Sequence, residues 1–287
     1  MATSQPPSTL VIGATGTVGS AVTQQLAAQE QPVRAATRRP DAYDAPSSHV
    51  HATAFEYTDA STYAPALDGV ARVFMLAPPD MQAYDHLVPF LDAVAEAGVE
   101  QVVLMTAMGV EHAPPEVPLR QAELHLQELN VAATIVRPGW FMQNFLTYWR
   151  GMIESSGMMR LPAGSAATSF VDARDIAAVS VAALTEDGHA GAAYTITGPE
   201  ALTYHEAADV LSEAWSRDIR YEPVSDEIAL DLFTSAGLDA DYAEMLVGLF
   251  QGVRAGQAAA VSPDVKQVTG QPPRSFHQFA ADTAGAW

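Results

Sequence analysis

Three glycines near the start of the chain have the spacing of a nucleotide-binding turn. Gly13, Gly16 and Gly19 follow a run of β-forming residues and precede a helix-like stretch. One glycine permits a tight turn, one lets the backbone approach a pyrophosphate, and one lets the helix pack closely on the strand. The helix N-terminus adds free N–H groups and a partial positive charge. Against the alternative of a turn without a ligand, the sequence predicts a dinucleotide site formed by Gly13, Thr15, Gly16, Thr17, Val18 and Gly19.

Two arginines indicate which dinucleotide this site binds. An NAD site usually carries an acidic residue at the end of the second strand, where it holds the ribose 2′-hydroxyl. Here Arg38 and Arg39 follow the second β-forming run. A guanidinium pair fits a 2′-phosphate through charge and bidentate hydrogen bonds, so the sequence predicts NADP(H) as the cofactor. Asp59 is placed either to contact the adenine or to cap the helix that follows.

Residue types exclude several other chemistries. The chain has no cysteine, which excludes disulfides, thiolate catalysis and cysteine-bound zinc. No His, Asp and Glu cluster has metal-binding spacing, and there is no Gly-x-Ser-x-Gly elbow of a hydrolase. Lys266 is the sole lysine and Ser262 stands four residues before it, so the Tyr-x-x-x-Lys pair of typical short-chain dehydrogenases is absent. A net charge of −20 argues against binding to nucleic acid.

A cluster of aromatic and methionine side chains after residue 139 is the candidate substrate region. Large apolar side chains with few polar neighbours are typical of selective pockets, and they favour a flat aromatic or conjugated ligand. The candidate catalytic residues are Asn144 and Tyr148, because a four-residue spacing places them on one helix face. The alternative is that these rings form core between two lobes. The predicted substrate residues are Trp140, Phe141, Phe145, Met108 and His112.

The elements that position these residues alternate between strands and helices. Six β-rich runs are predicted as strands, at 10–12, 33–37, 52–57, 72–76, 101–106 and 133–137. Helical patterns lie between them, at 18–29, 61–67, 81–97 and 119–129. This alternation is typical of an α/β fold with a Rossmann-type doubly wound parallel sheet. We expect an NADP-binding domain over 1–150 and a smaller α+β substrate-binding region over 151–287, packed on the first and sharing elements with it.

Neither a targeting segment nor a membrane segment is evident in the chain. Residues 1–7 have neither the basic nor the apolar part of a signal peptide. No stretch of eighteen or more residues is apolar enough to span a membrane. The sequence therefore predicts a soluble, cytoplasmic protein without a membrane partner.

Five stretches of the chain carry a family resemblance: GATGTVG at 13–19, TRRP at 37–40, RVFMLAPP at 72–79, RPGWFMQNF at 137–145 and SFVDARDIAAV at 169–179. Together they resemble the NmrA-like family of atypical short-chain dehydrogenase/reductase proteins. The last two stretches are the most specific, and the resemblance covers nearly the whole chain. It implies a Rossmann domain with a small C-terminal substrate region.

The resemblance also implies roles for individual residues. Phe141 and Asn144 would face the cleft above the nicotinamide. Arg120, three residues before Glu123, stands where related chains often carry Lys or His; it would contact ribose or phosphate but cannot shuttle a proton. The cofactor would in addition contact Leu76, Ala77, Pro78 and Thr106.

Two classes of function fit this reading. The first is an NAD(P)H-dependent oxidoreductase that reduces a quinone-like or other conjugated aromatic molecule by hydride transfer. Such an acceptor leaves a stabilised anion, so a strong general acid matters less. The second is a non-catalytic NADPH-sensing regulator, and a biosynthetic tailoring reductase or cyclase lies between the two. We expect an enzyme; a homodimer, and a protein partner in the case of a sensor, stay open.

Overall fold

The computed structural model describes residues 8–77 and 81–286, and its largest element is a seven-stranded sheet with the strand order β3-β2-β1-β4-β5-β6-β9. Strands β1 to β6 pair in parallel. The order 3-2-1-4-5-6 is that of the Rossmann fold, which confirms the predicted fold class. The seven strands are β1 (Ser8–Val11), β2 (Val33–Thr37), β3 (Val50–Ala54), β4 (Val70–Leu76), β5 (Gln101–Met105), β6 (Ala132–Pro138) and β9 (Ala193–Ile196).

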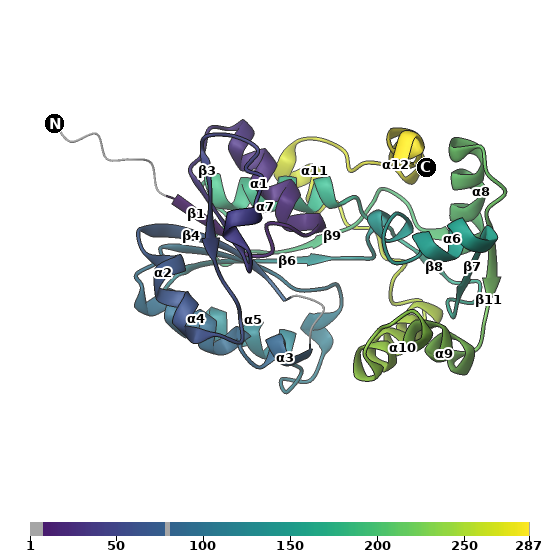
Figure 1. Cartoon of the computed structure of the whole chain (residues 1–287), viewed down its shortest axis with the longest axis horizontal. Coiled ribbons are helices and arrows are strands. Elements are labelled where there is room, and N and C mark those ends of the chain that lie inside the picture. Colours follow the sequence, from purple (N-terminus) through teal and green to yellow (C-terminus); the bar gives the residue numbers. More distant parts are fainter. Residues whose placement is uncertain (1–7, 78–80, 287) are drawn as a thin grey trace. The chain divides into compact units, whose positions relative to one another are not determined.

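Helices cover both faces of this sheet. Figure 1 shows α1 and α7 on one face and α2, α4 and α5 on the other. On the second face, the buried rings of Phe55, Tyr57, Tyr63 and Phe90 pack edge-on or stacked, with centroids 4.9–5.7 Å apart. The covering helices are α1 (Thr17–Ala28), α2 (Tyr63–Leu67), α4 (Leu87–Glu96), α5 (Pro118–Glu128) and α7 (Ala173–Thr185).

Two predicted elements differ from the structure. The helix expected over 81–97 is divided into α3 (Met81–Tyr84) and α4. Pro89 explains the break, because its ring would clash with the carbonyl of Asp85 in a continuous helix, whereas a proline is tolerated in the first turn of α4. The strand expected over 52–57 ends at Ala54, and the Glu56 amide then donates to the hydroxyl of Thr62 at 3.1 Å instead of continuing the ladder.

The chain folds into two compact units whose boundaries do not match a single cut in the sequence. The first unit comprises Met1–Arg137 and Ile176–Tyr194, and the second comprises Pro138–Asp175 and Thr195–Trp287. A division into 1–150 and 151–287 misses this arrangement, because most of α7 and the start of β9 return to the first unit. The turn after β6, which carries the predicted substrate residues from Trp140 on, belongs to the second unit.

The second unit consists of helices and two small sheets around an aromatic core. β8 (Ala167–Thr168) pairs with β10 (Leu202–Thr203), and β7 (Met158–Leu161) pairs with β11 (Arg220–Pro223). The buried ring of Tyr204 lies among those of Phe145, Trp149, Phe170 and Tyr221. The unit's helices are α6 (Arg150–Ser156), α8 (Tyr204–Trp215), α9 (Asp226–Ser235), α10 (Ala240–Arg254), α11 (Asp264–Thr269) and α12 (Phe276–Thr283).

Candidate cofactor and substrate sites

The glycine loop joins β1 to α1, and its three glycines differ in how much space surrounds them. Gly13 has φ of +73°, a conformation that favours glycine. A Cβ on Gly19 would lie 2.1 Å from the carbonyl oxygen of Gly13, so only glycine lets α1 approach the loop this closely. A Cβ on Gly16 would meet only that same oxygen, at 3.3 Å. The glycine at 19 thus serves helix packing, whereas the surface over Gly16 is left open.

The first turn of α1 presents unused hydrogen-bond donors. Gly16 is the N-cap residue, and no side chain of the described residues caps the helix there. Thr17, Val18 and Gly19 form the first turn, whose N–H groups have no intrahelical partner. These groups and the helix dipole attract an anion. The loop therefore has the features that a pyrophosphate requires.

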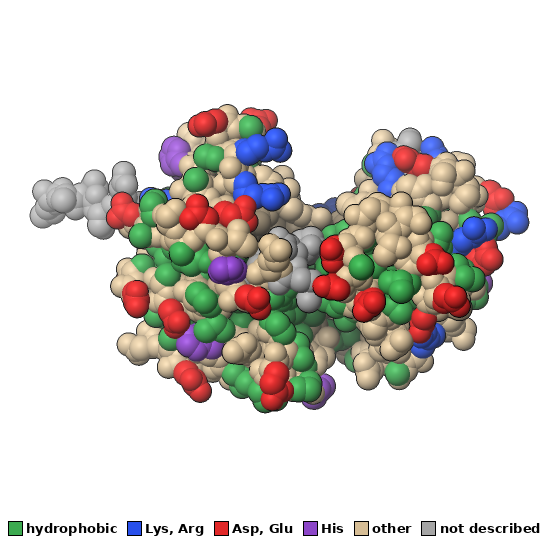
Figure 2. All heavy atoms as spheres, turned by 60° about the horizontal axis from the view of Figure 1, so that its bottom comes forward, with side chains coloured by type: hydrophobic (Ala, Val, Ile, Leu, Met, Phe, Trp, Pro, Cys, Tyr) green, Lys and Arg blue, Asp and Glu red, His purple; other side chains and the backbone are tan. Residues whose placement is uncertain are grey.

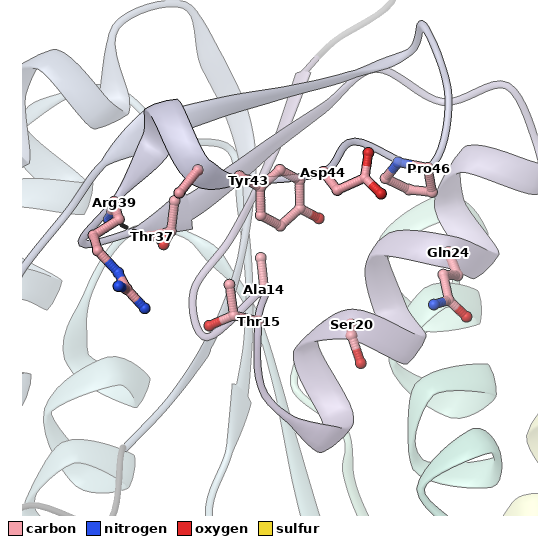
Figure 3. Close-up of a pocket in the computed structure, with 10 residues that line it drawn as sticks. Ala14, Thr15, Ser20, Gln24, Thr37, Arg39, Tyr43, Asp44 and Pro46 are labelled. Carbon is pink, nitrogen blue, oxygen red and sulfur yellow. Dashed lines mark hydrogen bonds between the residues drawn. The ribbon is translucent and has the colours of Figure 1, made fainter.

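A cavity of about 340 Å³ lies beside this loop, between α1 and the segment after β2. Arg39 contributes a guanidinium to the cavity, and Figure 3 shows its side chain extending on the same side as Thr15. Arg38 is 81% exposed and lies 3.8 Å from Glu56 instead. The two predicted arginines therefore differ in position, and Arg39 is the one at the cavity. The lining residues are Ala14, Thr15, Ser20, Gln24, Thr37, Arg39, Ala42, Tyr43, Asp44 and Pro46.

Four of these lining side chains carry polar groups that the sequence did not single out: Ser20, Gln24, Tyr43 and Asp44. Ser20 and Gln24 lie on α1 beyond the glycine motif, and Tyr43 follows the short helical turn Pro40–Ala42. Burial raises the pKa of the Tyr43 hydroxyl, which lies beside Thr23. The i, i+4 spacing of Ser20 and Gln24 is a signal that would have placed both on one face of α1.

Other predicted cofactor residues have clear structural contacts. The carboxylate of Asp59 accepts from the amide and the hydroxyl of Ser61, at 3.0 and 2.6 Å, so it caps the following turn, and an adenine contact stays a prediction. Leu76 ends β4, and its side chain is what a Cβ on Gly13 would meet. Ala77 is half-buried directly after β4, and Pro78 lies outside the described residues.

A charged network lies at the carboxyl ends of β5 and β6. The buried carboxylate of Glu123 accepts from the Thr106 hydroxyl at 2.7 Å and from Arg120 at 2.8 Å. Arg137 adds two further bonds to the same carboxylate, at 2.9 and 2.8 Å. Burial alone would raise the pKa of Glu123, but these hydrogen bonds and the charge of Arg137 hold it below its usual range. The structure thus joins the predicted Thr106 and Arg120 through a residue that was not predicted as functional.

The loop between Thr106 and α5 carries the two remaining predicted substrate residues of the first unit. Met108 is half-buried. His112 is exposed at the end of the turn Val110–His112. Neither residue is placed against a ligand surface within its own unit, so their substrate roles stay predictions.

In the second unit, the two most family-specific stretches of the sequence bind each other. Val171 donates its amide to the carbonyl of Trp140 and accepts from the amide of Met142, both at 2.8 Å. The Gln143 side chain donates to the carboxylate of Asp172 at 3.0 Å and accepts from the amide of Ala173 at 2.9 Å. RPGWFMQNF and FVDARDIA are therefore two halves of one hydrogen-bonded structure.

The predicted catalytic pair does not share a helix face. Asn144 lies in a 3₁₀ turn, Met142–Phe145, which ends before Tyr148. The expectation of one helix face is wrong, because a 3₁₀ turn repeats every three residues and this one is not continued. Tyr148 is 56% exposed, whereas Asn144 is half-buried. Their catalytic roles stay predictions.

The predicted substrate aromatics divide into core and partly exposed rings. Phe145 is fully buried, and its ring contacts those of Trp149, Phe170 and Phe276 with centroids 4.6–5.4 Å apart. It therefore belongs to the core of the second unit, which favours the alternative reading for this residue. Trp140 and Phe141 are only half-buried and keep surface for a ligand.

Neither a metal site nor a membrane-spanning helix is formed by the described residues. No group of three or more His, Cys, Asp or Glu side chains is arranged to hold a metal ion. No described helix has the length and apolar character needed to cross a membrane.

A Rossmann strand order, a glycine-rich loop between β1 and α1 and an adjacent cavity with an arginine define a dinucleotide-binding protein of the Rossmann class. A family model described as NAD(P)H-binding matches residues 13–187, and the chain belongs to this NAD(P)H-binding family.

Comparisons with known proteins support the same grouping over the full chain. NAD(P)H azoreductase from Xenophilus azovorans is 35% identical over 97% of this chain and 98% of its own. The (4-alkanoyl-5-oxo-2,5-dihydrofuran-3-yl)methyl phosphate reductase of Streptomyces griseus subsp. griseus is 37% identical, over 97% and 98%. The structure of NmrA, a negative transcriptional regulator, in complex with NADP is 16% identical with a TM-score of 0.77, over 98% of this chain and 96% of that one. This likeness shows that the two chains share a fold. Membership of the NAD(P)H-binding family is shown by the family model and by the two reductases.

Proposed function

We propose that the protein is an NADPH-dependent reductase of aromatic or quinone-like small molecules. The observation that carries the proposal is the cavity beside the glycine loop, in which Arg39 is the basic side chain among the described lining residues. A guanidinium at this position matches a 2′-phosphate, which NADPH has and NADH lacks. Two relatives above 30% identity over nearly the whole chain are reductases by name, one of them acting on azo compounds.

Different residues of the chain would bind different parts of this cofactor. The N–H groups at the start of α1 would bind the pyrophosphate, and Arg39 with Thr15 would bind the 2′-phosphate. The bound dihydronicotinamide would supply the hydride. Thr106 directly follows β5 at the carboxyl edge of the sheet, where ligands of Rossmann folds bind.

The proton supply sets the class of acceptor. The hydroxyl hydrogen of Thr106 is committed to Glu123, and Arg120 does not deprotonate. Tyr148 is exposed and can donate a proton, as can solvent. A quinone or an azo compound takes hydride to give a stabilised anion, which either weak donor can protonate. Reduction of a simple ketone would need a stronger, fixed acid.

The test is oxidation of NADPH in the presence of a panel of quinones and azo dyes, followed by loss of the dihydronicotinamide absorbance. We expect turnover with at least one conjugated acceptor and none with simple ketones, and Gly16→Val should abolish it. If NADPH binds tightly and no acceptor is reduced, the reductase proposal fails and the sensor remains.

The half-buried rings after β6 are the proposed acceptor wall. Phe141→Ala should raise KM for the acceptor and leave NADPH affinity unchanged, because Phe141 retains exposed surface and lies outside the unit that holds the glycine loop. Phe145→Ala should instead lower the melting temperature, since a Phe-to-Ala cavity costs about 3–5 kcal/mol. An equal loss of stability in both variants, with unchanged KM, would exclude Phe141 from the site.

A further inference from the structure

Among the described residues of the first unit, Glu123 is the acidic residue with a fully buried side chain. Its side chain is fully buried in α5, and it accepts four hydrogen bonds from three side chains: one from Arg120 on the same helix, one from Thr106 after β5 and two from Arg137 in β6. A buried carboxylate is costly unless it is paired in this way. The arrangement therefore fixes the geometry of all three partners at once.

The Thr106 hydroxyl has its direction set by this carboxylate. An ionised carboxylate only accepts hydrogen bonds, so the hydroxyl hydrogen of Thr106 must point to Glu123. The lone pairs of the Thr106 oxygen remain available. Toward any ligand at the end of β5, Thr106 is consequently an acceptor and not a donor.

The two arginines differ in how many donors they retain. Arg137 uses Nε and one terminal nitrogen on Glu123, and Nε also lies 3.6 Å from Glu111. Arg120 gives Glu123 a single bond through one terminal nitrogen, and its side chain is 20% exposed. A guanidinium has five N–H donors, so among the described residues Arg120 is held by one bond while most of its donors remain for a ligand.

The place of this network in the fold indicates which part of a ligand it meets. Thr106 directly follows β5, Arg137 lies near the end of β6, and Arg120 is in the first turn of α5, the helix that follows β5. All three therefore lie near the carboxyl ends of β5 and β6, two and three strands away from β1, after which the glycine loop comes. The cavity with Arg39 lies on the opposite side of β1, beside β2.

We propose that Glu123 is a positioning residue for the nicotinamide half of the cofactor: it holds Arg120 so that its free N–H groups donate to the ribose hydroxyls, and it holds Thr106 as an acceptor for a donor group such as the carboxamide. The proposal rests on the proposed cofactor, NADPH. Glu123 itself does not contact the ligand. Arg39 would bind the adenosine half of the cofactor, and Arg120 and Thr106, both held by Glu123, would bind the nicotinamide half.

Two probes separate these ends: NADPH, and adenosine 2′,5′-bisphosphate, which has the 2′-phosphate but lacks the nicotinamide half. Calorimetric titration should show that Glu123→Gln weakens NADPH binding roughly tenfold or more, the scale of hydrogen bonds to charged groups, and leaves the affinity for the bisphosphate unchanged. Arg120→Ala and Thr106→Val should show the same pattern. Arg39→Ala should weaken both ligands.

Controls make the outcome decisive. Asp175→Asn changes another buried carboxylate that pairs with an arginine, Arg274, but in the second unit. It should lower the melting temperature without changing the ratio of the two affinities. If Glu123→Gln and Thr106→Val bind both ligands as the unmodified protein does, or lose both equally, the positioning role is wrong. If the unmodified protein binds neither ligand, the proposed cofactor itself is wrong.

Should Glu123→Gln fail to fold, Thr106→Val and Arg120→Ala decide the question. Valine has the shape of threonine without the hydroxyl, and Arg120 is at the partly exposed edge of the network. Selective loss of NADPH affinity in both variants would support the proposal, and unchanged NADPH affinity in both would overturn it.

Discussion

At the scale of single residues, the positions of Arg38 and Arg39 determine the expected preference for NADPH over NADH. Arg39 lines the cavity beside the glycine loop, whereas Arg38 is exposed beside Glu56. Arg39→Ala should weaken NADPH binding by about 1.5–3 kcal/mol, because it removes hydrogen bonds to a charged group, and should leave NADH binding nearly unchanged. Arg38→Ala is the matched control and should have a smaller effect. Titration of both cofactors measures this; a larger loss in Arg38→Ala would mean that the cavity is not the 2′-phosphate site.

Among the secondary-structure elements, the loop between β1 and α1 contains one glycine needed for helix packing, Gly19, and one needed for cofactor binding, Gly16. Gly16→Val places a side chain on extended backbone near open surface, so the fold should persist while NADPH binding is lost. Gly19→Ala drives a Cβ into the Gly13 carbonyl and should cost roughly 1–3 kcal/mol of stability or more, as overpacking does. Thermal melts followed by circular dichroism, together with NADPH titration, distinguish the two variants. Equal stability of both would contradict this division.

The start of α7 also depends on one carboxylate, Asp172. It accepts from the amide and side chain of Arg174 at 2.7–3.0 Å, and Arg174 in turn reaches Asp282 at 2.7 Å. Burial would raise the pKa of Asp172, but the bonds from Arg174 and Gln143 hold it below its usual range. The folded pKa lies below the unfolded value, so ionised Asp172 stabilises the fold at neutral pH and this contribution is lost as the pH falls.

Asp172→Asn should therefore destabilise the protein by on the order of 2 kcal/mol at pH 7, since it weakens hydrogen bonds to a charged group. The difference from the unmodified protein should shrink as the pH falls below the ordinary Asp value of about 3.9. Denaturant unfolding at several pH values measures it. A difference that stays constant down to acid pH would show that the charge of Asp172 is not what stabilises the start of α7.

At the scale of the whole molecule, charge is unbalanced. The chain has 34 acidic and 14 basic residues, and Figure 2 shows carboxylates spread over the visible face. Repulsion between like charges destabilises a compact state. Salt screens this repulsion, and the screening length falls from about 10 Å at 0.1 M to about 3 Å at 1 M. The melting temperature should therefore rise between these salt concentrations, by about 2–4 °C for each kcal/mol of repulsion removed. A melting temperature that falls would show that attractive pairs such as Arg174–Asp282 dominate.

The sequence by itself determined the class of fold and cofactor. Gly13, Gly16 and Gly19 after a strand, and alternating β and α patterns, predicted the Rossmann sheet because such features are local and periodic. The pairing of Asp172 with Arg174 is also local, because the two residues are only two positions apart in the sequence.

Only the tertiary structure decided which candidates come together. Arg38 and Arg39 are equal in sequence, but the course of the chain after β2 brings only Arg39 to the cavity. Phe145 and Phe141 are equally aromatic, yet one is closed in by rings from distant parts of the second unit. Glu123 accepts hydrogen bonds from Thr106, 17 residues away after β5, and from Arg137, 14 residues away in β6. Contacts between residues far apart in the chain leave no local pattern, so no periodicity or spacing could reveal them.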